Sequence, residues 1–183
     1  MVHALYYPLL VAGATVAASL TGCQLSLSYV SVPAILSVPD VSEYAMLSMW
    51  RVTFNKGFYL CPTQALLSSL LFLLNAILTF FNQDASSADS KSTYPLVVAA
   101  VFAISLVPYT LTVIVPLEET LLKRQGNLSR GNLEQSSKGK VKNTEATADA
   151  IRSREMMERW ISLNYIRTLL PLTTVVWVWT RCW

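Results

Sequence analysis

Four long apolar stretches divide this chain of 183 residues, and polar segments separate them. We place the stretches at about residues 5–32, 62–81, 95–115 and 160–179. A helix needs about 20 apolar residues to cross a bilayer core of about 30 Å, and each stretch has about that length. The pattern predicts an all-α fold, an integral membrane four-helix bundle that forms a single domain over residues 1–183.

The connections between these stretches differ in character. Residues 125–143 are rich in Gly, Asn, Ser and Lys, which favours a long mobile loop before the last helix. From Thr144 the sequence is helical in pattern again, so we expect one long helix from there through the fourth stretch, with a kink near Pro171. In the first connection, residues 41–56 are expected to form a short helix at the membrane interface.

Composition supports a membrane protein. Hydrophobic residues make up 53% of the chain and charged residues 14%, against about 25% charged residues in a soluble domain. The net charge of +3 is too small to indicate nucleic-acid binding. We therefore expect the bilayer as a partner and no nucleic acid, and the sequence leaves the oligomeric state open.

The positions of the basic residues predict an orientation. Nine of the 14 Lys and Arg residues lie between the third and fourth stretches, and the second connection holds only Lys91. Positive charge favours the cytosolic side, so the first and third connections are expected there. Both termini are then expected on the lumenal side of a membrane, which we expect to be that of the endoplasmic reticulum.

The sequence offers few ligands for a metal or a cofactor. Cys23, Cys61 and Cys182 are widely separated, and His3 is the only histidine of the chain. No thiol and imidazole set has the spacing of a zinc or iron site, and no glycine-rich phosphate loop is present. We expect free thiols, no metal and no cofactor.

An amide and a guanidinium lie inside the fourth apolar stretch. Helical spacing places Trp160, Asn164 and Arg167 on one face. A charged side chain in a membrane helix costs at least about 2.5–3.5 kcal/mol, so it is usually kept for a function in the protein interior. Arg167 and Asn164 are therefore our first candidates for a catalytic site.

Other polar and aromatic residues are expected at the same level of the bundle. Glu118 and Asp40 are the candidate acids or bases, and Arg167 could instead pair with either of them to lock the bundle. Trp50 and Tyr29 reach this level from other segments, whereas Asn75 lies deeper and could be a contact between helices.

The ordered set of motifs resembles a family of small four-helix membrane proteins that includes the fungal anthrone oxygenases. The motifs that carry the resemblance span nearly the whole chain: Gly13, Gly22, Ser26, Ser28, Val32-Pro33-Ala34, Trp50, Gly57-Phe58-Tyr59, Pro62, Val107-Pro108-Tyr109-Thr110-Leu111, Pro116, Trp160, Leu163-Asn164 and Arg167. The resemblance implies a cofactor-free oxidation of an anthrone to an anthraquinone in polyketide (secondary metabolite) biosynthesis.

Residue roles follow from this resemblance as expectations. Arg167 and Asn164 would stabilise oxyanion charge, and Glu118 or Asp40 would accept a proton. The residues expected to contact an apolar polyketide substrate are Trp50, Trp160, Tyr109, Asn75 and Tyr29.

One departure from the family pattern keeps other functions open. The family usually carries Pro-Thr-Asn after the third span, whereas this chain has Pro116-Leu117-Glu118-Glu119. A carboxylate in place of an amide would suit a non-redox epoxide hydrolase or cyclase that uses Asp40, Glu43 or Glu118. A non-enzymatic membrane scaffold is a third possibility, and it predicts that the polar residues pair with each other and leave no cavity.

Overall fold

The computed structural model describes residues 3–81, 93–135 and 143–182, which are almost entirely helical and contain no strand. The first part of the chain forms one continuous rod from α1 (His3–Leu25), the π-helix η1 (Ser26–Ser31) and α2 (Val32–Ser37). After a short turn, α3 (Glu43–Phe81) runs back along it.

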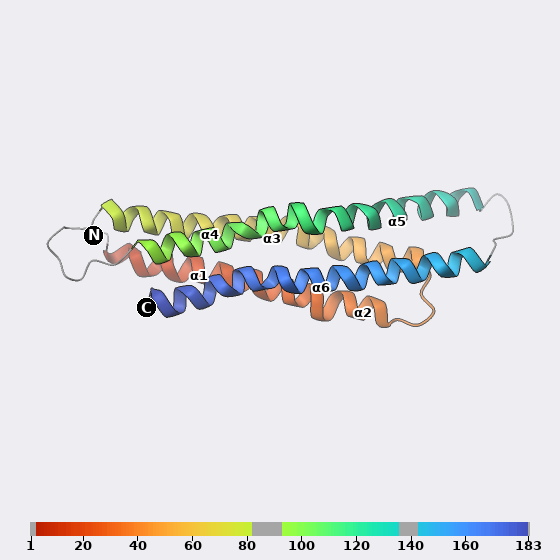
Figure 1. The fold of residues 1–183 in the computed structure, drawn as a ribbon, viewed down its shortest axis with the longest axis horizontal. Helices are drawn as coiled ribbons and strands as arrows, with labels where there is room; N and C mark the ends of the chain where they lie inside the picture. The colour runs from red at the N-terminus through yellow and green to blue at the C-terminus, as the bar shows by residue number, and fades with distance from the viewer. Residues whose placement is uncertain (1–2, 82–92, 136–142, 183) are drawn as a thin grey trace.

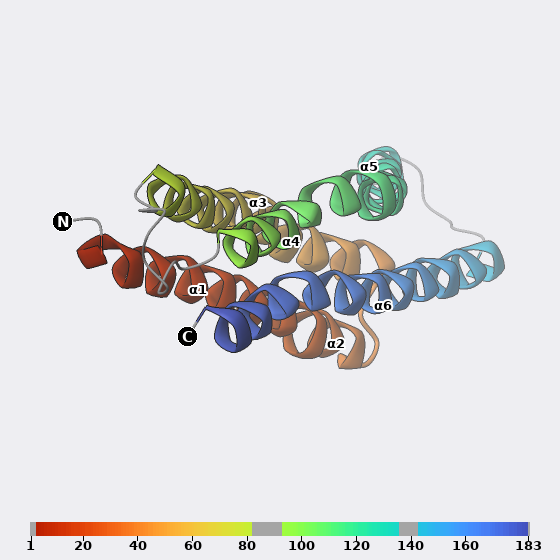
Figure 2. The ribbon, with the colours of Figure 1, turned by 60° about the vertical axis from the view of Figure 1, so that its left-hand side comes forward.

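The second half repeats this arrangement. A third rod consists of α4 (Tyr94–Tyr109), the π-helix η2 (Thr110–Ile114) and α5 (Val115–Gln135), and the fourth is α6 (Asn143–Arg181). The four rods are antiparallel, so both chain ends lie at the same end of an elongated bundle (Figure 1). Both α1 and α4 pack against α3 and α6, which places α1 and α4 on opposite corners (Figure 2).

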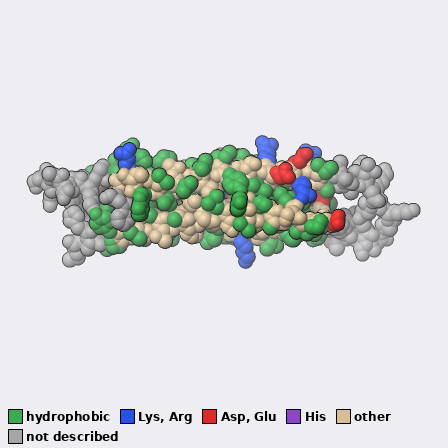
Figure 3. Space-filling model, turned by 90° about the horizontal axis from the view of Figure 1, so that it is seen from below, with side chains coloured by type: hydrophobic (Ala, Val, Ile, Leu, Met, Phe, Trp, Pro, Cys, Tyr) green, Lys and Arg blue, Asp and Glu red, His purple; other side chains and the backbone are tan. Residues whose placement is uncertain are grey.

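All four rods are long and apolar enough to cross a membrane, which confirms the predicted integral membrane bundle. Many large apolar side chains point outward, among them Tyr29, Tyr59 and Phe81, which are 74–78% exposed. Figure 3 shows this apolar surface, with the charged side chains gathered mainly toward the half of the molecule that holds α5 and the start of α6. A surface of this kind faces lipid rather than water.

The helices are longer than the sequence pattern indicated. The prediction of a separate interfacial helix over residues 41–56 was wrong, because α3 is continuous from Glu43 through Pro62. Ser42 caps its start, where the Ser42 Oγ accepts a hydrogen bond from the Ala45 N–H at 3.3 Å. The long helix expected after Thr144 is confirmed as α6, which continues through Pro171.

The predicted mobile loop over residues 125–143 was wrong for residues 125–135, which belong to α5. Residues 136–142 lie outside the described part of the chain. The Gly, Asn and Ser content of residues 125–143 suggested a loop. Gln125, however, is buried and hydrogen-bonded to α3. Tertiary contacts therefore override a weak local preference.

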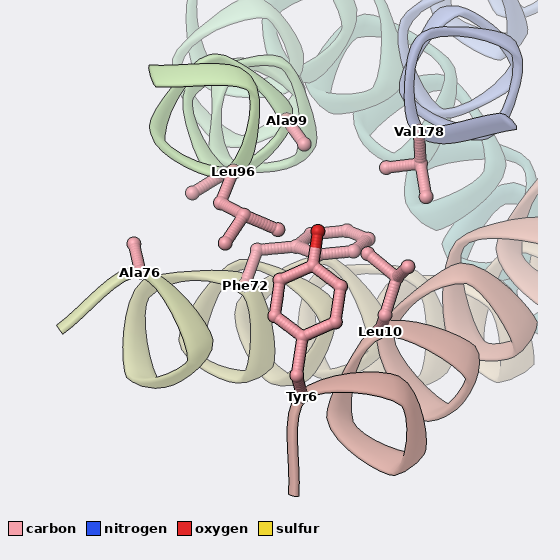
Figure 4. Close-up of a cluster of buried hydrophobic side chains, with 8 residues drawn as sticks. Tyr6, Leu10, Phe72, Ala76, Leu96, Ala99 and Val178 are labelled. Atoms are coloured by element: carbon pink, nitrogen blue, oxygen red, sulfur yellow. The ribbon is translucent and has the colours of Figure 1, made fainter. Parts of the chain in front are cut away.

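An apolar core fills the end of the bundle that holds the chain termini. Tyr6, Leu10, Phe72, Leu96 and Val178 converge there from all four rods (Figure 4).

Small and polar residues allow α1 and α3 to pack closely. The Ser68 hydroxyl donates to the Gly13 carbonyl at 3.0 Å, and the Asn75 amide donates to the Tyr6 carbonyl at 3.0 Å.

Two widened turns interrupt the first and third rods, and both end at a Val-Pro step. The N–H groups of Val32 and Val115 donate to the carbonyls of Leu27 and Thr110, five residues back in each case. The next residue is a proline in both rods, and its ring would clash with the carbonyl four residues earlier. A π turn relieves this clash, and such turns are frequent at functional sites.

Replacing Gly13 with Ala should destabilise the bundle, because an added Cβ would lie 2.8 Å from the buried Phe72 ring. Overpacking of this kind costs about 1–3 kcal/mol. The matched control is Gly22→Ala on the same helix, where an added Cβ meets no atom within 4 Å. Thermal unfolding in detergent should show a lower midpoint for Gly13→Ala only, and equal midpoints would contradict the packing described for α1 and α3.

Candidate functional site

Arg167 lies on α6 inside a membrane span, and only 6% of its surface is exposed. Within the described residues it makes no hydrogen bond or ion pair, and its Nε is buried without an acceptor. The pairing with Glu118 or Asp40 that would lock the bundle is therefore not observed there. An arginine side chain stays charged, so this is a buried cation without an ion-paired or hydrogen-bonded counterion among the described residues.

A cavity lies against Arg167 in the middle of the bundle. The empty space there is about 320 Å³, which includes space open to the outer surface. Its wall is formed by residues from α1/η1, α3, α4/η2 and α6: Leu27, Phe54, Gly57, Phe58, Cys61, Pro62, Leu106, Thr110, Trp160 and Arg167. The wall is mostly apolar, so Arg167 is its one charged member, which is the usual composition of a small-molecule site.

Aromatic rings form part of the cavity wall, where Phe54, Phe58 and Trp160 line it and Trp50 packs against them from behind. Trp50 and Trp160 meet edge to face with ring centroids 6.1 Å apart. Phe54 stacks on Trp50 at 5.3 Å with an interplanar angle of 7°, and Phe58 follows at 5.4 Å from Phe54. Flat rings in this arrangement can accept a planar aromatic ligand by stacking.

Glu118 lies behind Trp160 and is 2% exposed. Its Oε1 accepts a hydrogen bond from the Trp160 indole N–H at 3.1 Å, and the carboxylate interacts electrostatically with Arg167. Glu119, the next residue, is instead exposed and pairs with Lys123 at 3.5 Å. Helical geometry therefore turns one of two adjacent carboxylates toward the site and leaves the other on the surface.

Asn164 is fully buried beside η1. Its Nδ2 donates to the Ser28 hydroxyl at 2.6 Å and lies 3.5 Å from the Gln24 carbonyl oxygen, while its Oδ1 has no partner within the described residues. The π turn brings Ser28 inward to receive this bond. The free atom of Asn164 is thus an acceptor, which suits a ligand hydroxyl better than the oxyanion expected from the sequence.

Gln24 is a site candidate that the sequence reasoning missed. It is fully buried on α1, and neither atom of its amide has a partner within the described residues. Its side chain approaches the thiol of Cys61, which lines the cavity. An amide in the first apolar stretch was a detectable signal of the same kind as Arg167 in the fourth.

Of the nine predicted site residues, Arg167 and Trp160 line the cavity, and four others pack around it without forming its wall: Trp50, Glu118, Asn164 and Tyr109. The remaining three lie away from it. Asp40 is exposed in the turn between α2 and α3, where its φ of 56° is left-handed and it borders a separate surface pocket with Arg154. Tyr29 is 74% exposed, because it lies on the outer face of η1. Asn75 joins α3 to α1 in the core at the opposite end, as described above.

Tyr109 occupies an intermediate position. Its hydroxyl donates to the Leu163 carbonyl at 3.2 Å and so ties α4 to α6, one residue before Asn164. The contact supports the position of α6 at the site.

A charged network closes the bundle beyond the aromatic rings. Glu43 accepts two hydrogen bonds from Arg124, at 2.8 and 3.1 Å, and a third from the Ser153 hydroxyl at 2.6 Å. Arg124 also pairs with Asp149 at 2.7 Å, and the network joins α3, α5 and α6. Glu43 is therefore bonded within this network and does not line the cavity.

The thiols are free in the described structure, as expected. Cys23 and Cys61 approach to 4.0 Å between sulfur atoms across α1 and α3, and Cys182 lies near the C-terminal end. No group of three metal-binding side chains occurs within residues 3–81, 93–135 and 143–182.

Comparison with known proteins agrees with this geometry. Residues 50–177, more than half of the chain, match the model of the anthrone oxygenase family. The chain belongs to the anthrone oxygenase family. It is 26% identical over 153 residues to "Anthrone oxygenase tpcL" of Aspergillus fumigatus, a match that covers 84% of this chain and 80% of that protein.

A second family member is similarly related. "Anthrone oxygenase AgnL2" of Paecilomyces divaricatus is 25% identical over 153 residues, covering 84% of this chain and 82% of that protein. No solved structure matches. The region matched to the family includes Trp50, Glu118, Trp160 and Arg167, whereas Gln24 precedes it.

Proposed function

We propose that this anthrone oxygenase family member oxidises an anthrone to an anthraquinone with dioxygen, as a tailoring step of fungal-type polyketide biosynthesis. The observation that carries the proposal is the unpaired guanidinium of Arg167 beside an aromatic-lined cavity within the membrane span. The names of the two relatives support the choice of reaction. An apolar tricyclic substrate would be concentrated in the bilayer that surrounds the bundle.

The proposed chemistry depends on an enolate. An anthrone carries a ketone and a methylene at opposite positions of its central ring. Loss of a methylene proton delocalises the electron pair onto the ketone oxygen, and the electron-rich carbon can then react with dioxygen itself. The methylene loses two hydrogens and gains one oxygen atom, and the other atom of dioxygen leaves as water. The protein must supply a base and a cation.

Arg167 and Glu118 are the residues proposed for these two roles. They are the only arginine and the only glutamate that are buried in the described part of the chain. Arg167 lines the cavity and would stabilise the negative charge on the ketone oxygen. Glu118 would accept the methylene proton once the bound ring displaces the indole of Trp160 from its carboxylate, since catalytic hydrogen bonds are often completed only when substrate binds.

The remaining residues would hold the substrate. Trp160 and Phe58 line the cavity and are suited to stack on its flat rings, Trp50 would support Trp160 from behind, and Asn164 offers an acceptor to a ring hydroxyl. Epoxide opening would need a second carboxyl group, but Asp40 is exposed and Glu43 is bonded to Arg124. A scaffold would need paired polar groups and no cavity. Both alternatives are therefore less well supported.

We further propose that the charged end of the bundle is cytosolic, with both chain ends in the lumen of the endoplasmic reticulum. The support is the excess of Lys and Arg between α4 and the apolar half of α6. A glycosylation acceptor placed after Trp183 should be glycosylated in microsomes, whereas one inserted near Lys140 should not. The reverse pattern would contradict this orientation.

Isotope labelling tests the reaction class. Purified protein in detergent, given an anthrone under ¹⁸O₂, should introduce one labelled oxygen atom into the anthraquinone, with the second appearing in water. Mass spectrometry of the product measures this, and a reaction without protein corrects for spontaneous oxidation. Label that enters only from H₂¹⁸O would contradict oxidation by dioxygen and favour a hydrolytic reaction.

Two variants test the assignment of roles. Glu118→Gln should lower kcat by about 10²–10⁴-fold, because it removes the base. Arg167→Met should lower kcat/KM by about 10²–10³-fold, because it removes the charge that stabilises the enolate. Glu119→Gln is the matched control, since Glu119 is exposed and pairs only with Lys123 in the described structure. Equal activity of Glu118→Gln and Glu119→Gln would refute the role of Glu118.

A further inference from the structure

Gln24 has no structural partner that explains its burial. Its side chain is fully buried, and both the Nε2 donor and the Oε1 acceptor lack partners within the described residues. Most hydroxyl groups in the spans satisfy themselves locally, as Thr21 does on the carbonyl of Ala17 at 2.9 Å. A glutamine has no such option once it points into the bundle. Buried polar groups without partners are uncommon and often await a ligand or a water molecule.

The unpaired atoms around Gln24 form one set. The Asn164 amide donates to the main-chain carbonyl of Gln24 at 3.5 Å and leaves its own Oδ1 free. The Gln24 side chain lies behind the cavity wall, where it approaches Cys61. Cys61 and Arg167 both line the cavity, and the Arg167 Nε is also unpaired. The set therefore holds two unpaired donors, on Gln24 and Arg167, and two unpaired acceptors, on Gln24 and Asn164.

This combination selects for a particular ligand chemistry. A ligand with oxygen acceptors alone would satisfy the two donors and leave two acceptors buried and unpaired. A ketone with a hydroxyl at the nearest free position of the flanking aromatic ring offers both functions side by side. Its ketone oxygen can accept hydrogen bonds, and its hydroxyl can donate one and accept another.

We propose that Gln24 is a substrate-binding residue that recognises a hydroxyl next to the ketone of the anthrone, while Arg167 holds the ketone oxygen itself. The proposal rests on the function proposed above and assigns a role to a residue that precedes the region matched to the family. A bound substrate would take the space that the Cys61 thiol occupies beside the Gln24 amide. The carboxamide would then exchange two hydrogen bonds with this hydroxyl, and a hydroxyl on the other side of the ketone would donate to the Asn164 Oδ1.

The test compares two substrates in two matched variants. Gln24→Met keeps the length of the side chain and removes both polar atoms. Gln64→Met is the control, because Gln64 also has an unpaired Oε1, but its Nε2 donates to Ser19 at 3.2 Å in an exposed contact. The substrates are unsubstituted anthrone and an anthrone with hydroxyls on both sides of the ketone.

Gln24→Met should lower kcat/KM for the hydroxylated anthrone by about 10–100-fold, as expected for the loss of one or two buried hydrogen bonds. Its kcat/KM for unsubstituted anthrone should stay within about threefold of wild type, and Gln64→Met should match wild type with both substrates. Thermal unfolding checks that both variants fold, and Gln24→Leu replaces Gln24→Met if the latter does not.

Three results would overturn the proposal. Loss of activity with both substrates alike would mean that Gln24 supports the fold, and no loss with either would mean that it holds a water molecule.

If wild type oxidises neither anthrone, the proposed reaction fails, and a binding measurement then tests the role of Gln24 separately. Fluorescence quenching should then show weaker binding of a hydroxylated anthraquinone, but not of unsubstituted anthraquinone, to Gln24→Met, and equal affinities would overturn it.

Discussion

The structure depends on one constraint, which is that polar atoms inside a membrane bundle have no water to bond to. Most of the chain meets this constraint locally. The hydroxyls of Thr21 and Thr168 donate to carbonyls one helical turn back, and Asn75 donates across the α1–α3 contact. The main exception is the group formed by Gln24, Asn164 and Arg167, which carries four of the six buried unpaired atoms of the described residues, and of the three only Arg167 lines the cavity. An arrangement that is costly for folding is best explained by the ligand that would complete it.

The rest of the bundle holds this exception in place from both ends. An apolar core around Phe72 joins the four rods near the chain termini, and the network around Arg124 joins α3, α5 and α6 at the other end. Between them, π turns before Pro33 and Pro116 bring Ser28 and Thr110 into the interior. Rigid packing on both sides allows the middle of the bundle to keep a narrow, incompletely satisfied site.

Apolar periodicity was sufficient to predict the four helices, because twenty apolar residues in lipid have few alternatives to a helix. It was also sufficient to select Arg167 and Asn164 as buried. It failed where tertiary contacts decide: Pro62 was expected to begin a helix but lies inside α3, and α5 continues through residues 125–135. Asp40 could not be placed from the sequence, because its position depends on a left-handed turn. Gln24 could have been found by asking which polar residues interrupt an apolar stretch.

The central claim is that Arg167 is kept unpaired for a ligand, and ligand-dependent stability tests it most directly. A hydroxylated anthraquinone at about 100 times its dissociation constant should stabilise the wild type by about 2.7 kcal/mol and raise its unfolding midpoint in detergent. Arg167→Met should be at least as stable as wild type without ligand, because it removes a buried charge that has no ion-paired partner among the described residues, and the same ligand should not shift its midpoint. A destabilised Arg167→Met protein that still gains the full ligand shift would contradict the claim and make Arg167 a structural residue.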